Sequence, residues 1–160
     1  RVFKMKIGIM SDSHGQEKAV KIAVEKMGAV DLWIHCGDHD KDSLLLRTGA
    51  VKEVIAVQGN CDYHSCYKVD EFIEIAGKKI WITHGHQYKI KNSKLELLWW
   101  AKQYEVDIVI YGHTHIAENV MIDNVVLFNP GSVGSPRQGK PSCGLLEINK
   151  EIVKFEIIQL

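Results

Sequence analysis

The first half of the chain alternates short apolar runs with stretches that repeat apolar residues at helical spacing. The apolar runs are residues 7–10, 32–36 and 54–57, and residues 16–27 carry the strongest helical repeat. A shorter helix is predicted at residues 43–48, opened by Ser43 and closed before Gly49. This order of elements predicts a parallel β-α-β-α-β unit.

The second half changes to a pattern of paired strands. Residues 69–76 and 79–84 flank a turn and predict a β-hairpin. A second long helix is predicted at residues 93–104, with Ser93 and Glu96 at the spacing of a capping box. The other predicted strands are residues 107–111, 118–122, 125–128, 143–148 and 151–158. The short strands from residue 118 onward suggest a second, more antiparallel sheet. Residues 130–142, which lie between the strands 125–128 and 143–148, are rich in glycine and proline and predict a long loop.

Length and composition fit one folded unit. The 160 residues are 46% apolar and 25% charged, so we expect one domain over residues 1–160 with a sizeable core. Together with the order of elements, this predicts an α/β fold in which two mixed sheets form a sandwich flanked by helices. The formal net charge is zero, which argues against a nucleic-acid partner.

Cysteine usage and hydropathy indicate the cellular setting. The four cysteines form no CxxC pair, and a core of this size needs no disulfide, so reduced thiols in the cytoplasm are expected. No signal-peptide core precedes Asp12. The longest apolar runs are far too short to cross a bilayer, so no membrane partner is expected.

Side chains that bind metals follow five of the apolar runs. Open sheets place their sites at the carboxyl ends of strands, so these side chains are expected to converge in one sheet region. The candidates are Asp12, His14, Asp38, Asn60, His84, His113 and His115. In extended backbone, residues two apart project to one side, which would pair Asp12 with His14 and His113 with His115.

The donor types favour a catalytic metal site. Carboxylate, amide and imidazole groups suit Mn²⁺, Fe²⁺, Co²⁺, Ni²⁺ or Zn²⁺, and these seven ligands are enough for two ions. Two ions ~3.5–4 Å apart can hold a phosphoryl group and generate hydroxide at neutral pH. Each motif alone also fits an ordinary turn or surface loop, whereas the ordered set favours the metal site.

Other polar and aromatic residues have a structural interpretation beside a functional one. His35 is expected to be a hydrogen-bonded core histidine, and His39 a solvated loop residue. The guanidinium of Arg137 is able to bind a substrate phosphate, but a surface or subunit contact fits equally well. One ring of the Trp99-Trp100 pair is expected in the core. The other would face a partner subunit or a second internal layer, so a homo-oligomer stays open.

The order of the motifs resembles that of a known family. D-x-H, GD, GN, H-G-H and GH-T-H, spread over roughly residues 4–157, resemble the calcineurin-like metallophosphoesterase superfamily. The short length, the GNCD sequence and the Asn129-Pro130-Gly131-Ser132 loop resemble its small, cap-less YfcE-like phosphodiesterase branch. The resemblance implies a four-layer α-β-β-α sandwich with a dinuclear metal site.

The resemblance also divides the candidate ligands between two divalent ions, with Mn²⁺ preferred over Ni²⁺, Fe²⁺, Co²⁺ or Zn²⁺. It implies a first set of Asp12, His14 and His115, a second set of Asn60, His84 and His113, and a bridging Asp38. Asn60 would also contact the substrate phosphate. A hydroxide between the ions would attack phosphorus in line.

One position departs from the pattern of the superfamily. Many members have a histidine after GN that protonates the leaving oxygen or binds phosphate, whereas this chain has Cys61 followed by Asp62. A thiol does not carry positive charge, so Cys61 is a weak catalytic candidate. His86 and His64 are alternative proton donors.

The sequence therefore predicts metal-dependent hydrolysis of small phosphodiesters, with monoesters as an open addition. One alternative is a protein-binding scaffold like the retromer subunit, which resembles this family but has a degraded metal site. All seven ligand positions are filled here, which favours the enzyme. A nuclease is a third hypothesis, disfavoured by the neutral charge.

Overall fold

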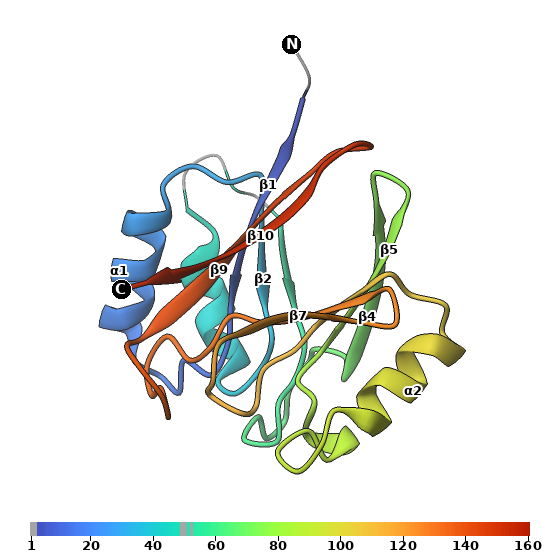
Figure 1. The fold of residues 1–160 in the computed structure, drawn as a ribbon. Coiled ribbons are helices and arrows are strands. Elements are labelled where there is room, and N and C mark those ends of the chain that lie inside the picture. The colour runs from blue at the N-terminus through green and yellow to red at the C-terminus, as the bar shows by residue number, and fades with distance from the viewer. Residues whose placement is uncertain (1–2, 49–50, 52) are drawn as a thin grey trace.

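Two sheets built from ten strands form the centre of the computed structural model, which describes residues 3–48, 51 and 53–160 (Figure 1). The first sheet has the order β10-β9-β1-β2-β3. Its strands are β1 (Met5–Met10), β2 (Leu32–His35), β3 (Val54–Ala56), β9 (Ser142–Ile148) and β10 (Val153–Gln159). β1, β2 and β3 are parallel, which confirms the predicted β-α-β-α-β unit.

The second sheet has the order β4-β5-β6-β8-β7 and is also mixed. Its strands are β4 (Asp70–Ile75), β5 (Lys78–Thr83), β6 (Ile108–Ile110), β7 (Glu118–Ile122) and β8 (Val125–Asn129). The β4–β5 hairpin confirms the predicted one, and β5, β6 and β8 run parallel.

The last two strands belong to the first sheet, so the expectation that they extend a second, antiparallel sheet is wrong. β9 pairs antiparallel with β1, and β10 pairs with β9. The reason is burial, because Leu146 and Ile148 enter the same core as Ile7 and Ile9. Alternation along a strand sets which face is apolar but does not name the partner strand.

Alternate residues of the strands separate three apolar cores. Ile7 and Ile9 of β1 meet Ile80 and Ile82 of β5 between the two sheets. Trp33 of β2 points away from that core and packs under α1 (Glu17–Met27) and the 3₁₀ helix η1 (Asp40–Leu46). α2 (Leu95–Gln103) covers the outer face of the second sheet. α1 and α2 thus lie on opposite sides of the sheets (Figure 1), which confirms the four-layer α-β-β-α sandwich.

Two predicted helix starts are wrong. η1 begins at Asp40 and is a 3₁₀ helix, and the hydroxyl of Ser43 lies within it, 2.9 Å from the Tyr67 hydroxyl. Gly49, the predicted end signal, lies outside the described residues. Lys94 is the N-cap of α2 and makes no side-chain capping bond. Ser93 instead accepts a hydrogen bond of 3.1 Å from the Leu95 N–H, so the capping box does not form.

Three smaller features bear on the sequence predictions. Trp99 is 53% exposed, whereas Trp100 packs against the outer core of α2. All four cysteines are free, as expected, with Cys36 and Cys143 buried. Among the described residues, no helix combines the length and apolarity that a bilayer crossing requires.

Candidate metal centre

The candidate ligands follow strands of both sheets, not one. β1, β2 and β3 of the first sheet lead into the loops with Asp12, His14, Asp38 and Asn60. β5 and β6 of the second sheet lead into the loops with His84, His113 and His115. The expectation of a single sheet region is therefore wrong in detail, although the side chains do converge. The site bridges the sandwich.

Six of these side chains form two groups that share one carboxylate. In each group the donor atoms all lie within 4.8 Å of one another. The first group is Asp12, His14, Asp38 and His115, and the second is Asp38, His84 and His113. Oδ1 of Asn60 lies 3.1 Å from Nε2 of His84, beside the second group.

The chemistry of this cluster fits divalent cations. Nε2 of His14 lies 3.3 Å from Nε2 of His115, and Nδ1 of His113 lies 3.2 Å from Nε2 of His84. Oδ1 of Asp12 is buried, makes no hydrogen bond within the described residues and lies 3.2 Å from Nε2 of His115. A buried carboxylate oxygen without a partner is costly unless a positive charge reaches it. Converging imidazole nitrogens around such an oxygen are the donors that a transition-metal ion requires.

Left-handed backbone, not extended backbone, orients five of the candidate ligands. Positive φ angles occur at Asp12 (54°), His14 (48°), Asp38 (59°), His113 (69°) and His115 (59°). Each such residue costs on the order of 1–3 kcal/mol, which the surrounding sheets must offset. The prediction from extended geometry that His113 and His115 point to one side is wrong, because their side chains enter different groups. A Cβ at Gly59 would overlap the Asp38 carboxylate, so close packing also requires glycine there.

The carboxylate of Asp62 fastens two of the ligand loops together. It accepts hydrogen bonds from the N–H groups of Asp38 (2.8 Å), His39 (2.7 Å), Asp40 (3.0 Å) and Gly59 (2.7 Å). The loops after β2 and β3 are thereby tied beside the shared Asp38. Sequence reasoning missed this role, and its only signal was an acid at the end of GNCD.

His35 fastens the loops after β1 and β2, as a core histidine should. Its ring is fully buried, and Nδ1 accepts a hydrogen bond of 3.1 Å from the Gly37 N–H. Nε2 then carries the proton and donates to Oγ of Ser13 at 2.9 Å. Burial lowers the pKa of His35 to about 4, so the ring is neutral at neutral pH. His39 is 47% exposed, as expected for a loop residue, and its Nε2 lies 3.7 Å from Asp42.

The charges in the cluster support one another. Burial opposes ionisation of Asp12 and Asp38, but the imidazoles of His115 and His84 outweigh it and lower the pKa of both carboxyls. The pKa of His84 is raised by Asp38 and Asp12 against the effect of burial, and that of His115 is raised by Asp12. His113 differs, because burial and the charges of His84 and Lys91 lower its pKa to about 4.

The weaker candidates lie at the edge of the cluster. The N–H of Cys61 donates to Oδ1 of Asp38 at 2.9 Å, and burial and the Asp38 charge raise the pKa of its thiol. The ring of His86 lies 5.4 Å from that of His84, and its buried Nδ1 has no partner among the described residues. Arg137 touches the site through its backbone N–H, which donates to the His115 carbonyl at 3.1 Å.

A cluster of candidate metal ligands at the strand ends of an α-β-β-α sandwich is typical of metal-dependent phosphoesterases, and comparison with known proteins agrees. Residues 5–151 match the model of the calcineurin-like phosphoesterase superfamily domain. A probable metallophosphoesterase of Bacillus subtilis is 36% identical over 83% of this chain and 78% of its own length. A phosphodiesterase of Methanocaldococcus jannaschii is 34% identical over 92% of this chain and 95% of its own length.

The fold is also similar to the solved structure of a protein that is not named as a phosphoesterase. Wild-type Vps29 from Entamoeba histolytica, complexed with Zn²⁺, superimposes with a TM-score of 0.75 at 25% identity, over 97% of this chain and 99% of that one. The domain match and the relatives together make the family plain: this chain belongs to the calcineurin-like phosphoesterase superfamily.

The role of Asp62 gives the first prediction. In Asp62→Asn, an amide NH₂ replaces one oxygen that faces two backbone N–H donors. We expect the free energy of unfolding, measured by urea denaturation, to fall by about 1–3 kcal/mol. Metal affinity should fall too, because the Asp38 loop loses its anchor. Asp31 accepts a single backbone hydrogen bond, from Lys6, so Asp31→Asn is the control. Equal stability of the two variants would contradict the anchoring role.

The raised pKa values of His84 and His115 give the second prediction. Below a raised pKa the imidazole is protonated and binds no metal, so each ion must displace protons. Because fewer imidazoles are protonated at higher pH, metal affinity should rise between pH 6 and 8, by about tenfold per pH unit for each proton released. Calorimetry in two buffers of different ionisation enthalpy measures the released protons. Metal binding without proton release at pH 6 would show that these imidazoles are already neutral.

Proposed function

We propose that this chain hydrolyses small phosphodiesters with two divalent cations, Mn²⁺ being the first candidate. Asp12, His14 and His115 would hold one ion, while Asn60, His84 and His113 would hold the other. Asp38 would bind both. When bound, the ions would lower the pKa of water and neutralise charge on the phosphoryl oxygens.

The observation that carries this proposal is the shared position of Asp38 in both donor groups. A structural ion needs one closed set of about four ligands, whereas two adjoining sets suit phosphoryl transfer. Access supports the same conclusion, since the His14 side chain is 29% exposed and Asn60 is exposed at the rim. The relatives named phosphodiesterase and metallophosphoesterase support the reaction class.

The protein groups around the ions have separate tasks. In the net reaction, a water oxygen bonds to phosphorus and one ester arm leaves as an alcohol. The lowered pKa of His113 keeps its ring neutral, so its lone pair is available for a cation at neutral pH. The NH₂ group of Asn60 makes a weak contact of 3.6 Å with the Cys61 sulfur, which leaves its N–H bonds able to orient the phosphate.

A non-catalytic protein-binding scaffold is the second candidate, favoured by the likeness to Vps29. Exposed aromatic side chains add to that case, because Phe72, Trp99 and Tyr104 are 49%, 53% and 39% exposed. The completeness of the ligand set favours the enzyme. Metal-dependent turnover of a diester decides between the two.

The bridging role of Asp38 is tested with Asp38→Asn. We expect kcat for bis(p-nitrophenyl) phosphate, at saturating Mn²⁺, to fall at least about 100-fold, because losing the shared charge should cost no less than losing one oxyanion donor. Arg137→Ala should have a smaller effect. Asp123→Asn, a surface change 61% exposed in the β7–β8 turn, is the control. Near-wild-type turnover in Asp38→Asn would remove the bridge, and no turnover by the wild-type protein would favour the scaffold.

The Cys61 position predicts a dependence on the leaving group. Its raised pKa keeps the thiol neutral and a poor acid, so alkoxide arms leave slowly while nitrophenolate leaves without a proton. General acid catalysis supplies about 10²–10⁴-fold, so Cys61→His should flatten the dependence of rate on leaving-group pKa. A series of aryl diesters, compared at equal metal occupancy, measures this slope. Cys66→His, at another exposed cysteine, is the control. Identical slopes in wild-type and Cys61→His, with chemistry limiting, would exclude a proton-donor role for this position.

A further inference from the structure

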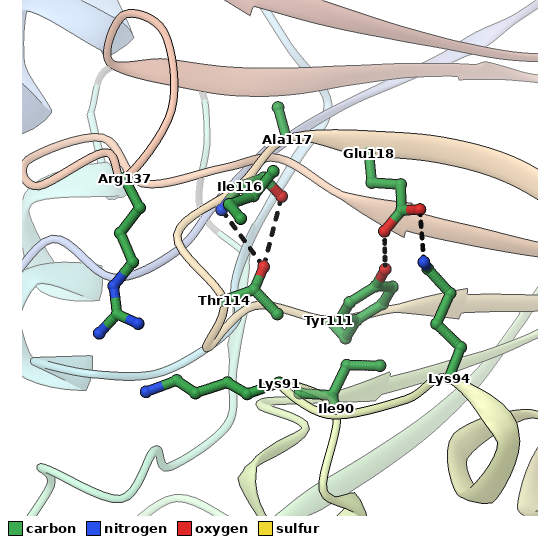
Figure 2. Close-up of a pocket in the computed structure, with 9 residues that line it drawn as sticks. All are labelled: Ile90, Lys91, Lys94, Tyr111, Thr114, Ile116, Ala117, Glu118 and Arg137. Atoms are coloured by element: carbon green, nitrogen blue, oxygen red, sulfur yellow. Dashed lines mark hydrogen bonds and ion pairs between the residues drawn. The ribbon is translucent and has the colours of Figure 1, made fainter.

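A pocket of about 450 Å³ opens beside the metal-ligand cluster and has no role in the reaction as described so far (Figure 2). Its walls come from the stretch before α2, the end of β6, the start of β7 and the loop of residues 130–141. The polar side chains that line it are Lys91, Lys94, Tyr111, Thr114, Glu118 and Arg137. This volume lies within the usual range of small-ligand sites, about 300–1,000 Å³.

Charge is distributed unevenly along this pocket. At one end Lys94 pairs with Glu118 at 2.7 Å, and the Tyr111 hydroxyl donates to the same carboxylate at 2.9 Å. That end is neutral and internally bonded. The charged ends of Lys91 and Arg137 lie toward the opposite end (Figure 2). Neither side chain takes part in an ion pair within the described part of the chain. The pocket therefore offers two uncompensated positive charges.

These two cations lie next to the proposed reaction centre. Thr114, in the pocket wall, stands between the two ligands His113 and His115. The backbone N–H of Arg137 donates to the His115 carbonyl, and Asn129 fixes the wall by donating to Oγ1 of Thr114 at 3.0 Å. A diester bound at the centre would thus extend one arm into the pocket.

We infer that the pocket selects phosphodiesters whose non-leaving arm carries a second, terminal phosphate; this inference rests on the proposed function. Lys91 and Arg137 would bind that phosphate together. A guanidinium matches two phosphate oxygens at once, and an ammonium adds a compact charge beside it. A simple diester carries one negative charge at the reaction centre and leaves these two cations unused. The apolar side chains of the lining, such as Ile90 and Ile116, would face the body of the arm.

Two matched substrates test this inference without altering the reacting bond. They are thymidine 5′-(p-nitrophenyl phosphate) and the same compound with a 3′-phosphate. In both, a water oxygen bonds to the 5′ phosphorus while the bond to nitrophenolate breaks and the electron pair leaves with it. Hydrogen bonds to charged groups imply a kcat/KM about 10- to 100-fold higher for the 3′-phosphorylated compound. The gain should appear in KM, since the added contact is the same in ground and transition states.

Variants locate the effect. Lys91→Ala and Arg137→Ala should each lower the ratio of kcat/KM between the two substrates, and Arg137→Lys should keep part of it. Lys150 lies in the turn between β9 and β10, outside the pocket and exposed, so Lys150→Ala removes one positive charge as a control. An unchanged ratio in Lys91→Ala and Arg137→Ala would overturn the inference.

Binding to the metal-free protein gives a readout independent of turnover. Calorimetry should show tighter binding of thymidine 3′,5′-bisphosphate than of thymidine 5′-monophosphate, and Arg137→Ala should remove the difference. Hydrolysis of both nitrophenyl substrates with equal KM would overturn the pocket assignment and leave the diesterase standing. Selective binding of the bisphosphate with no hydrolysis of either substrate would support the pocket and refute the diesterase.

Discussion

The site depends on two carboxylates that are buried at the ends of parallel strands and need compensating charge and hydrogen bonds. Asp12 and Asp38 are 0% and 2% exposed, and removing an ionised carboxylate from water costs several kcal/mol unless charge and hydrogen bonds replace the solvent. The chain supplies backbone N–H groups from His113 and Cys61 and surrounds the pair with imidazoles. Oδ1 of Asp12 makes no hydrogen bond within the described residues, and its nearest cationic neighbour is Nε2 of His115, 3.2 Å away. The cluster is arranged for positive charge that the protein does not itself fully provide.

The loops hold this arrangement because their backbone is fixed from outside the cluster. Left-handed conformations at non-glycine residues are unfavourable alone, so neighbouring groups must determine them. Asp62 collects four backbone donors from the loops after β2 and β3, and His35 joins the loops after β1 and β2. Asn129 does the same for the loop after β6, since its amide donates to Gly112 and Thr114. These hydrogen bonds, together with the sheets behind the loops, hold the candidate ligands beside one another.

Sequence reasoning recovered the elements and the candidate ligands but not what depends on long-range pairing. Alternation predicts Ile7, Ile9, Ile80 and Ile82 as buried strand positions, and a polar residue after each strand marks a ligand loop. The assignment of β9 and β10 to the first sheet could not be predicted. Apolar residues such as Leu146 show that one face of β9 is buried, but they do not show which strand pairs with β9. The left-handed angle at His113 is likewise invisible, since it results from the packing of neighbouring loops. The anchoring role of Asp62 and the placement of Lys91 and Arg137 in one pocket both result from contacts between loops that are far apart in the sequence.

The origin of the ligands in two sheets has a consequence for the order of assembly. His14 and His115 meet at 3.3 Å although they are 101 residues apart in the chain. Until the strand β6 and its loop have emerged, a growing polypeptide on the ribosome holds three of the four residues of the first donor group and two of the three residues of the second, so neither group is complete. Capture of a cation by the complete cluster, as proposed, would therefore come after most of the chain exists, and the bound ion would then cross-link the two halves of the sandwich.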